Sequence, residues 1–258
     1  MRICRRRFTC AVPAIGLVVA CSRGSIRSDA PRSAETPAET SAARQAATGT
    51  HHYATRFPGT ENPISEGGHW INGGSVGLDW TNVSTIPGLA IGHQVGASFT
   101  DATALLTGAW GPDQRVAATV YATGERDACS QEVELRLRSE ISAHRNAGYE
   151  IGYHVAQGPA AYMIIVRWNG ALGDYTYLLK ESGARYGIGN GDVVSASIAG
   201  SVITAYRNGK EMGRATDSTF RRGVPGMGFN LESAPAGCAG TNGDYGFTSY
   251  TATDRAGP

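Results

Sequence analysis

Residues 203–215 read Ile-Thr-Ala-Tyr-Arg-Asn-Gly-Lys-Glu-Met-Gly-Arg-Ala, and this sequence predicts a β-hairpin. The pair Asn208-Gly209 favours the tight turn between two antiparallel strands, because both central residues of that turn need a positive φ. We therefore expect Ile203–Arg207 to pair with Glu211–Ala215. Short alternating stretches and glycine-rich turns continue outward from this hairpin in both directions, which makes it one unit of a larger β structure.

The stretch Gln131–Arg138 alternates between an apolar and a charged face. The two faces hold Val133, Leu135 and Leu137 on one side and Glu132, Glu134, Arg136 and Arg138 on the other. This period of two predicts a half-buried antiparallel strand. Further strands are expected at Ala97–Leu106, Arg115–Ala122, Tyr149–Val155, Tyr162–Asn169, Tyr175–Glu181, Asp192–Ala199, Ser201–Asn208 and Tyr245–Ala252. Turns are expected between them, among others at Asn146–Gly148 and Gly223–Gly226.

The composition agrees with this pattern. Glycine makes up 35 of the 258 residues and only 17% of the chain is charged, which disfavours a helical bundle. The many short strands predict an all-β fold, an antiparallel two-sheet β-sandwich of the jelly-roll kind. The net charge of +1 provides no basic surface for nucleic acid, so we expect no nucleic-acid partner.

The N-terminus has the organisation of a secretory signal peptide. Four arginines precede an apolar run, Phe8–Ala20, that is too short to span a bilayer as a helix. Val18-Val19-Ala20-Cys21 resembles the lipobox of bacterial lipoproteins. The resemblance implies that residues 1–20 are removed and that Cys21 carries the lipid, which would be the only attachment to the membrane. With Ser22 next, it implies a secreted protein of the cell envelope, held at the outer membrane.

The domain organisation follows from the residues after Cys21. Residues 21–52 combine this cysteine with a segment of small and polar residues, which predicts a disordered tether. Residues 53–258 then form one β-sandwich domain. Two cysteines fall in that domain, Cys129 and Cys238, and an even pair in an oxidising compartment predicts a disulfide.

The domain resembles the concanavalin A-like lectin/glucanase superfamily, which includes laminin-G-like domains. The likeness covers Phe57–Ala252, and its most telling stretches are the hairpin at 203–215 and the run Gly223–Phe229. It implies a jelly roll that binds glycan or a protein of the envelope. Some lectins of this superfamily hold a structural Ca²⁺. No set of oxygen ligands for that ion can be located in the sequence, and we expect no other cofactor or metal.

The first candidate for chemistry is the pair Glu132 and Glu134. Side chains at i and i+2 of a strand lie about 6.5–7 Å apart, and a retaining glycosidase uses two carboxyl groups about 5–5.5 Å apart. The glucanase branch resembles this strand with a Glu-x-Asp-x-x-Glu motif, but here Arg136 and Arg138 follow instead of a third carboxylate. The alternative is a surface ladder of paired glutamates and arginines. The alternation of charges favours the ladder.

Two further candidates remain. A polysaccharide lyase would combine arginines with a His/Tyr pair, but Tyr153 and His154 are adjacent on a strand, so only His154 can share the charged face. A sugar-binding platform would use aromatic rings beside polar groups. Its candidates are Trp80, Trp110, Arg136, Arg138, Arg167, Trp168 and Tyr175. The alternative for the tryptophans is a place in the core.

These observations predict a lipid-anchored envelope protein whose sandwich domain binds carbohydrate or an envelope partner without catalysis. The alternative is a glycoside hydrolase or polysaccharide lyase that acts on envelope or extracellular glycan. A purely structural envelope module is the third possibility.

Overall fold

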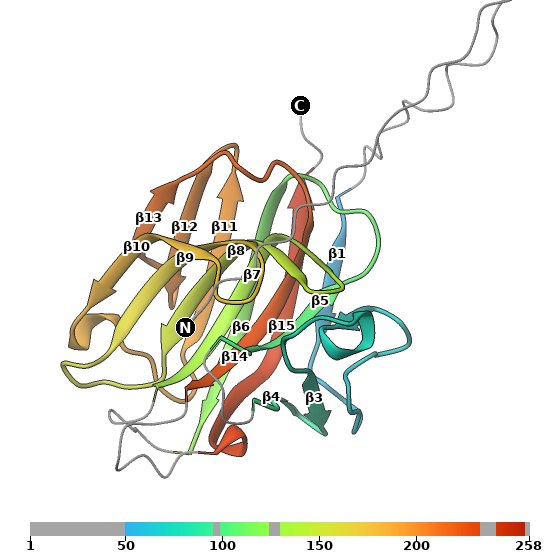
Figure 1. The fold of residues 1–258 in the computed structure, drawn as a ribbon. Helices are drawn as coiled ribbons and strands as arrows, with labels where there is room; N and C mark the ends of the chain where they lie inside the picture. Colours follow the sequence, from blue (N-terminus) through green and yellow to red (C-terminus); the bar gives the residue numbers. More distant parts are fainter. Residues whose placement is uncertain (1–49, 95–98, 124–129, 233–240, 256–258) are drawn as a thin grey trace, which may run out of the picture. The chain divides into compact units, whose positions relative to one another are not determined.

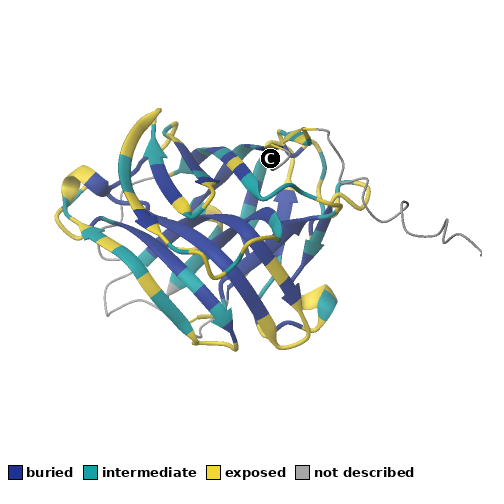
Figure 2. Cartoon of the chain, turned by 90° about the horizontal axis from the view of Figure 1, so that it is seen from above, coloured by how far each residue is buried: buried dark blue, intermediate teal, exposed yellow. Residues whose placement is uncertain are grey.

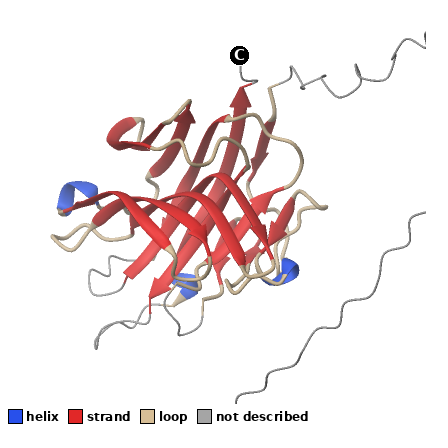
Figure 3. Ribbon diagram, turned by 45° about the horizontal axis from the view of Figure 1, so that its top comes forward, coloured by secondary structure: helices blue, strands red, loops and turns tan. Residues whose placement is uncertain are grey.

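The computed structural model describes residues 50–94, 99–123, 130–232 and 241–255 (Figure 1). Within these ranges the chain forms fifteen β-strands and three single-turn 3-10 helices, which confirms the all-β prediction (Figure 3). None of the described helices has the length and apolar character needed to cross a membrane. The predicted lipid site at Cys21 and the predicted Cys129–Cys238 disulfide lie outside the described residues.

The first sheet has eight strands, and all of its pairings are antiparallel. Its order is β13 (Lys210–Thr216), β12 (Val202–Arg207), β11 (Val193–Ala199), β6 (Asp113–Ala122), β15 (Tyr245–Arg255), β4 (Leu89–Gly92) and β3 (Val83–Ile86), with β1 (His52–Thr55) also paired to β15. The predicted hairpin is confirmed here as β12 and β13. Asn208 and Gly209 have φ values of 50° and 77°, as the tight turn requires.

The second sheet has seven strands and is also antiparallel. Its order is β10 (Tyr175–Ser182), β9 (Tyr162–Gly170), β8 (Arg145–His154), β7 (Ser130–Ser142), β14 (Val224–Glu232), β5 (Ala102–Leu106) and β2 (Trp70–Asn72). Two predicted turns are wrong. Asn146–Gly148 lies inside β8, and most of Gly223–Gly226 belongs to β14.

The core lies between the two sheets, where the central strands are buried (Figure 2). Val133, Leu135 and Leu137 of β7 contribute one predicted apolar face to it. The hydroxyl of Tyr153 on β8 donates to the carbonyl of Ser195 on β11 at 2.9 Å, which links one sheet to the other. The outer face of the seven-stranded sheet, opposite the core, therefore carries the alternate residues of β7, β8 and β9.

Candidate functional site

The charged residues of β7 lie on the outer face, but they are not exposed. Glu132, Glu134 and Arg136 are 3%, 0% and 1% exposed. The prediction of a half-buried strand with a solvent-facing ladder is wrong, because residues from other elements cover this face of β7 as well. A burial this complete requires that each charge has a partner or a proton.

Arg136 is the centre of the buried cluster. Its guanidinium bonds Glu134 on the same strand, reaches Glu150 of β8 at 2.6 Å, and lies 3.8 Å from Asp101, just before β5. Oxygens of Asp101, Glu134 and Glu150 lie within 4.8 Å of one another, as the ligands of a divalent cation would. The guanidinium of Arg136 already forms ion pairs with these carboxylates and so takes the place that a metal ion would occupy.

The cluster has more carboxylates than cations. Burial raises the pKa of Glu132 well above its ordinary value, and the charges of Glu150 and Asp101 raise it further, while a hydrogen bond with Tyr162 opposes them. Burial likewise raises the pKa of Glu134, against the lowering effect of Arg136. The cluster therefore holds protons at pH values where an exposed glutamate has lost its own.

Two glycines make room for these side chains. A Cβ added at Gly152 of β8 would meet the carboxyl carbon of Glu132 at 2.6 Å. One added at Gly228 of β14 would collide with the Glu134 carboxylate and lie 2.9 Å from the carbonyl oxygen of Ala102. The neighbouring strands thus lack side chains where the carboxylates of β7 lie.

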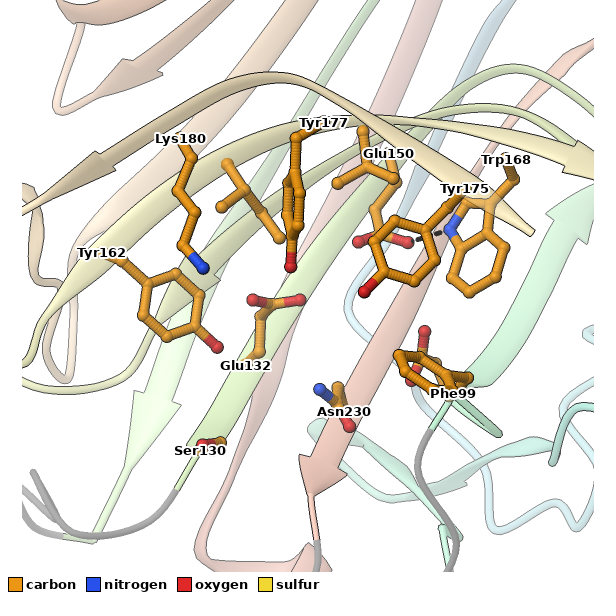
Figure 4. A pocket seen from close by; sticks show the side chains of 13 residues that line it. Phe99, Ser130, Glu132, Glu150, Tyr162, Trp168, Tyr175, Tyr177, Lys180 and Asn230 are labelled. Carbon is orange, nitrogen blue, oxygen red and sulfur yellow. Dashed lines mark hydrogen bonds between the residues drawn. The ribbon is translucent and has the colours of Figure 1, made fainter. Parts of the chain in front are cut away.

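A cavity of about 370 Å³ opens beside the cluster (Figure 4). Its lining comes from five strands and the segment before β5, and it combines five aromatic rings with polar and charged groups. The aromatic residues are Phe99, Tyr162, Trp168, Tyr175 and Tyr177. The charged and polar residues are Asp101, Ser130, Glu132, Glu150, Lys180 and Asn230. We call this cavity the aromatic pocket.

The rings of the aromatic pocket contact one another. Tyr175 lies 5.4 Å from Trp168, 5.2 Å from Tyr177 and 5.4 Å from Phe99, measured between ring centroids. The indole of Trp168 donates to Glu150 at 2.5 Å, which connects the rings to the buried cluster (Figure 4). Tyr177 and Phe99 are 45% and 42% exposed, so their rings face solvent at the mouth.

Residues 73–82, which we call the strap, cross the outer face next to the pocket. The backbone of Gly73 donates to Thr103 of β5, and Gly77 accepts from His144 at the β7–β8 turn. The ring of Trp80 packs edge-on against Trp168 of β9, with centroids 5.3 Å apart. The strap thus reaches from one side of the sheet to the other.

A second cavity, of about 630 Å³, is lined in part by Ile71, Leu105 and Ile141. Trp80 is buried in one cluster with residues from the linings of both cavities. The strap therefore lies close to both cavities.

The remaining predicted residues occupy different places. His154 lies across from Glu132 in the strand pairing, stacks on Tyr162 at 4.7 Å, and contacts the carbonyl of Ala160 through Nδ1. Trp80, a residue of the strap, is buried and does not line the pocket. Trp110 donates to the carbonyl of Thr107 and lies far enough from the pocket to contribute nothing to its lining.

Two predicted arginines do not join the site. The chain bulges after Leu137, and Arg138 has a φ of 45°, so its guanidinium bonds the carbonyls of Pro112 and Phe220 instead of facing the pocket. Arg167 lies between Val166 and Trp168, which line the pocket, so its side chain points to the opposite face of β9. There its guanidinium pairs with Asp217 at 2.6 Å. The expectation that Arg138 shares a face with Glu132 is therefore wrong.

Several lining residues were not among the predicted site residues. Phe99, Asp101, Glu150, Tyr162, Lys180 and Asn230 all line the pocket. The sequence could have indicated Glu150 and Tyr162. Glu150 shares a strand face with the candidate His154, and Tyr162 shares one with the candidate Trp168. No local signal marks Asp101 or Asn230, which reach the pocket through the pairing of β14 with β5 and β7.

Comparisons with known proteins identify the fold. The sequence matches no protein-family model and no curated protein. The exoplasmic/lumenal domain of VIP36, in its metal-free form, is 10% identical with a TM-score of 0.51, over 81% of this chain and 93% of that chain. The carbohydrate-binding module CBM66 from Bacillus subtilis is 12% identical with a TM-score of 0.46, over 72% and 92%. A β-porphyranase from Bacteroides plebeius is 10% identical with a TM-score of 0.46, over 80% and 92%. The chain has a concanavalin A-like jelly-roll fold.

Proposed function

We propose that the aromatic pocket binds carbohydrate. The observation that carries this proposal is the set of five rings around a cavity that also presents carboxylates and the amide of Asn230. Aromatic rings stack on the apolar faces of sugars, and carboxylates and amides bind their hydroxyl groups. The volume of about 370 Å³ falls within the range of small-ligand sites, about 300–1,000 Å³.

A glycan array with the purified protein tests the proposal. Tyr177→Ala removes an exposed ring at the mouth, and we expect it to weaken binding about two- to tenfold. Tyr121→Ala, on β6 of the other sheet, is the matched control and should bind like the wild type. Binding to no glycan, or equal binding by the wild type and Tyr177→Ala, would contradict the proposal.

A second candidate function is glycoside hydrolysis. It is favoured by Glu132, whose raised pKa suits a general acid, and by Glu150, whose pairing with Arg136 suits a carboxylate base or nucleophile. In this arrangement Glu150 of the adjacent strand supplies the carboxylate that the β7 sequence lacks. A reducing-end assay on the glycans that bind is the test, and Glu132→Gln should abolish turnover while binding remains.

The lyase alternative has less support. The sequence suggested Tyr153 as the partner of His154 in proton transfer, but the Tyr153 hydroxyl bonds Ser195 in the core. Arg138, the second arginine of that hypothesis, points away from the pocket. The predicted arginine pair therefore does not face the pocket, and the tyrosine beside His154 is Tyr162 and not Tyr153.

We also propose that the protein is anchored in the cell envelope through lipidated Cys21, at the outer membrane. The support is the lipobox-like run Val18–Cys21 after an arginine-rich start. Metabolic labelling with a fatty-acid analogue should tag the wild type and leave Cys21→Ser untagged. Equal labelling of both proteins would contradict the anchor and leave the carbohydrate proposal untouched.

A further inference from the structure

A further cavity, of about 440 Å³, is lined by residues around the turn of the β12–β13 hairpin and by the single-turn helix Ala184–Tyr186. It shares no lining residue with the aromatic pocket. Three cations line it, which are Arg185, Arg207 and Lys210, and the one acid among its described lining residues is Glu211. We call this cavity the basic pocket.

The three cations of the basic pocket have no carboxylate partner. Glu211 accepts two hydrogen bonds from the guanidinium of Arg214, at 2.8 and 2.6 Å, so its charge is already paired. Within the described ranges, Arg185, Arg207 and Lys210 form no ion pair. Acidic residues outnumber basic ones from residue 51 onward, so this gathering of positive charge does not follow from the composition of the domain.

Two of the cations are held in place by neutral groups. The guanidinium of Arg207 donates to the carbonyl of Gly187, directly after the helix. The guanidinium of Arg185 lies over the ring of Tyr186, 4.3 Å from its centroid, and donates to its hydroxyl. A guanidinium has five N–H donors, so both arginines retain donors for a ligand. Because both are already positioned, a ligand orders them at a lower cost in conformational entropy.

Lys210 completes the set across the hairpin turn. It is the direct partner of Arg207 in the strand pairing, so the two side chains project from the same side of the hairpin. Lys210 is exposed, and in the described part of the chain its ammonium group has no hydrogen-bond partner. Its three N–H donors are therefore free to bind a ligand.

Two neighbouring carboxylates are bonded by neutral side chains that line the pocket. Glu181 accepts from the hydroxyl of Tyr186 at 2.7 Å, and Asp192 accepts from the side-chain amide of Asn208 at 2.7 Å. Neither carboxylate lines the basic pocket itself. A ligand that enters the cavity therefore meets three unpaired cations and one carboxylate that is already paired.

We propose that the basic pocket binds a phosphate monoester, with the phosphate group between Arg185, Arg207 and Lys210. Guanidinium groups bind phosphate oxygens in a bidentate geometry, and a lysine adds a point charge. A phosphate monoester carries about 1.5 to 2 negative charges at pH 7 on three acceptor oxygens. It therefore matches three cations better than a carboxylate or a sulfate ester, which carries a single charge. The volume of about 440 Å³ suits a small phosphorylated molecule.

Glycerol 3-phosphate, glycerol 3-sulfate and glycerol test the charge of the ligand, because they share one carrier and differ only in the charged group. The measurement is calorimetry with the purified protein at about pH 7.5, above the second pKa of the phosphate, which is about 6. We expect glycerol 3-phosphate to bind at least about tenfold more tightly than glycerol 3-sulfate. Glycerol should show no measurable binding.

Vesicles distinguish a lipid source of the monoester from a soluble one. Sedimentation compares vesicles that contain phosphatidate, a monoester, with vesicles that contain phosphatidylglycerol, a singly charged diester. A preference for phosphatidate that Lys210→Gln removes would assign the phosphate to a lipid headgroup. Binding of free glycerol 3-phosphate without this preference would assign it to a soluble molecule.

Variants locate the phosphate. We expect Lys210→Gln to weaken binding of glycerol 3-phosphate by about tenfold, whereas Lys210→Arg keeps the charge and should bind within about threefold of the wild type. Lys180→Gln is the matched comparison, because Lys180 is the only other lysine of the chain and lines the aromatic pocket instead. Thermal melting of all three variants shows that each is folded.

Several results would overturn the proposal. Glycerol 3-phosphate that does not bind, or that binds no more tightly than glycerol 3-sulfate, would do so. Equal affinity in the wild type and Lys210→Gln would also do so, and so would an equal loss in Lys180→Gln, which would place the phosphate in the aromatic pocket. Lys210→Gln should bind the glycan array like the wild type, so the carbohydrate proposal is tested separately.

Discussion

Arg136 is a fully buried arginine in the middle of a sheet face, and the cluster depends on it. Removing it would leave Glu134 and Glu150 buried without their cation. We expect Arg136→Met to lower the free energy of unfolding by about 3–5 kcal/mol, measured by urea denaturation. Arg214→Gln, which breaks the exposed pair with Glu211, should change it by less than about 0.5 kcal/mol. Similar losses for both variants would contradict this account of the cluster.

Glu132 makes stability depend on pH. Its pKa is raised in the folded state by burial first, whereas the unfolded chain ionises near the ordinary value of 4.5. Above that pH the unfolded state releases a proton that the folded state keeps, so stability falls as the pH rises toward the folded pKa.

Glu132→Gln cannot ionise, so its melting temperature should fall less steeply between about pH 4.5 and neutrality. Glu134 retains a slope of the same sign in the variant, which therefore flattens the profile without levelling it. Scanning calorimetry across this range is the measurement. Parallel profiles for the wild type and the variant would show that Glu132 ionises normally in the folded protein.

At the scale of residues, the sequence predicted which side chains share a face and missed how deeply they are buried. Alternation along β7 placed Glu132 and Glu134 together correctly. Their burial involves residues that are distant in sequence, such as Tyr162, which bonds Glu132 and which no local pattern connects with it. The diversion of Arg138 depends on a bulge, and an added residue in one strand leaves no local signature in this alternation.

At the scale of elements, glycines in β8 and β14 decide whether the cluster fits. We expect Gly228→Ala to lower the free energy of unfolding by about 1–3 kcal/mol, because the new methyl group would meet both the Glu134 carboxylate and the Ala102 carbonyl. Gly59→Ala has open space around its added Cβ and is the control. Denaturant unfolding of the two variants side by side is the measurement. A Gly228→Ala protein as stable as the control would show that the carboxylate moves freely.

Other glycines, at the start of β14, explain one wrong prediction. Gly223–Gly226 has the composition of a turn, yet β14 begins at Val224. Gly226 does not reverse the chain there; it lets β14 approach the Ala104 carbonyl of β5 closely. The strands β1 to β4 were not predicted because each has only three or four residues, too few to show a period. The hairpin of β12 and β13 was predictable, because both strands and their turn are local.

The strap is held chiefly by Trp80, which is 2% exposed and packs against Trp168. We expect Trp80→Ala to lower the free energy of unfolding by about 3–5 kcal/mol, since it leaves a large cavity on the outer face. The exposed contact between His144 and Asp79 should contribute far less, so Asp79→Asn serves as the control. Equal effects on chemical denaturation would mean that the strap is not fastened by its tryptophan.

At the scale of the whole molecule, the fold class followed from many short strands and turns, but the arrangement of the sheets did not. The central pairings join distant segments, such as β6 with β15 and β7 with β14. Local sequence patterns carry no information about such partners. The aromatic pocket combines the successive strands β7 to β10 with β14 and the segment before β5, and the position of these last two could not be predicted locally. Its rings could therefore be predicted as candidates only one at a time.

The strap also bears on how this protein would meet a polymer. Because Trp80 of the strap packs against Trp168 at the wall of the aromatic pocket, we expect a long glycan to meet the strap there and to offer the pocket its terminus. The amount of protein bound at saturation would then depend on the number of chain termini and not on the mass of the polymer. A polysaccharide that binds the pocket, cut into progressively shorter chains, should bind more protein per gram in proportion to the number of chains. A constant capacity per gram would show that the polymer passes the strap. A protein with this property would collect where glycans are being cut, since each cut creates new termini.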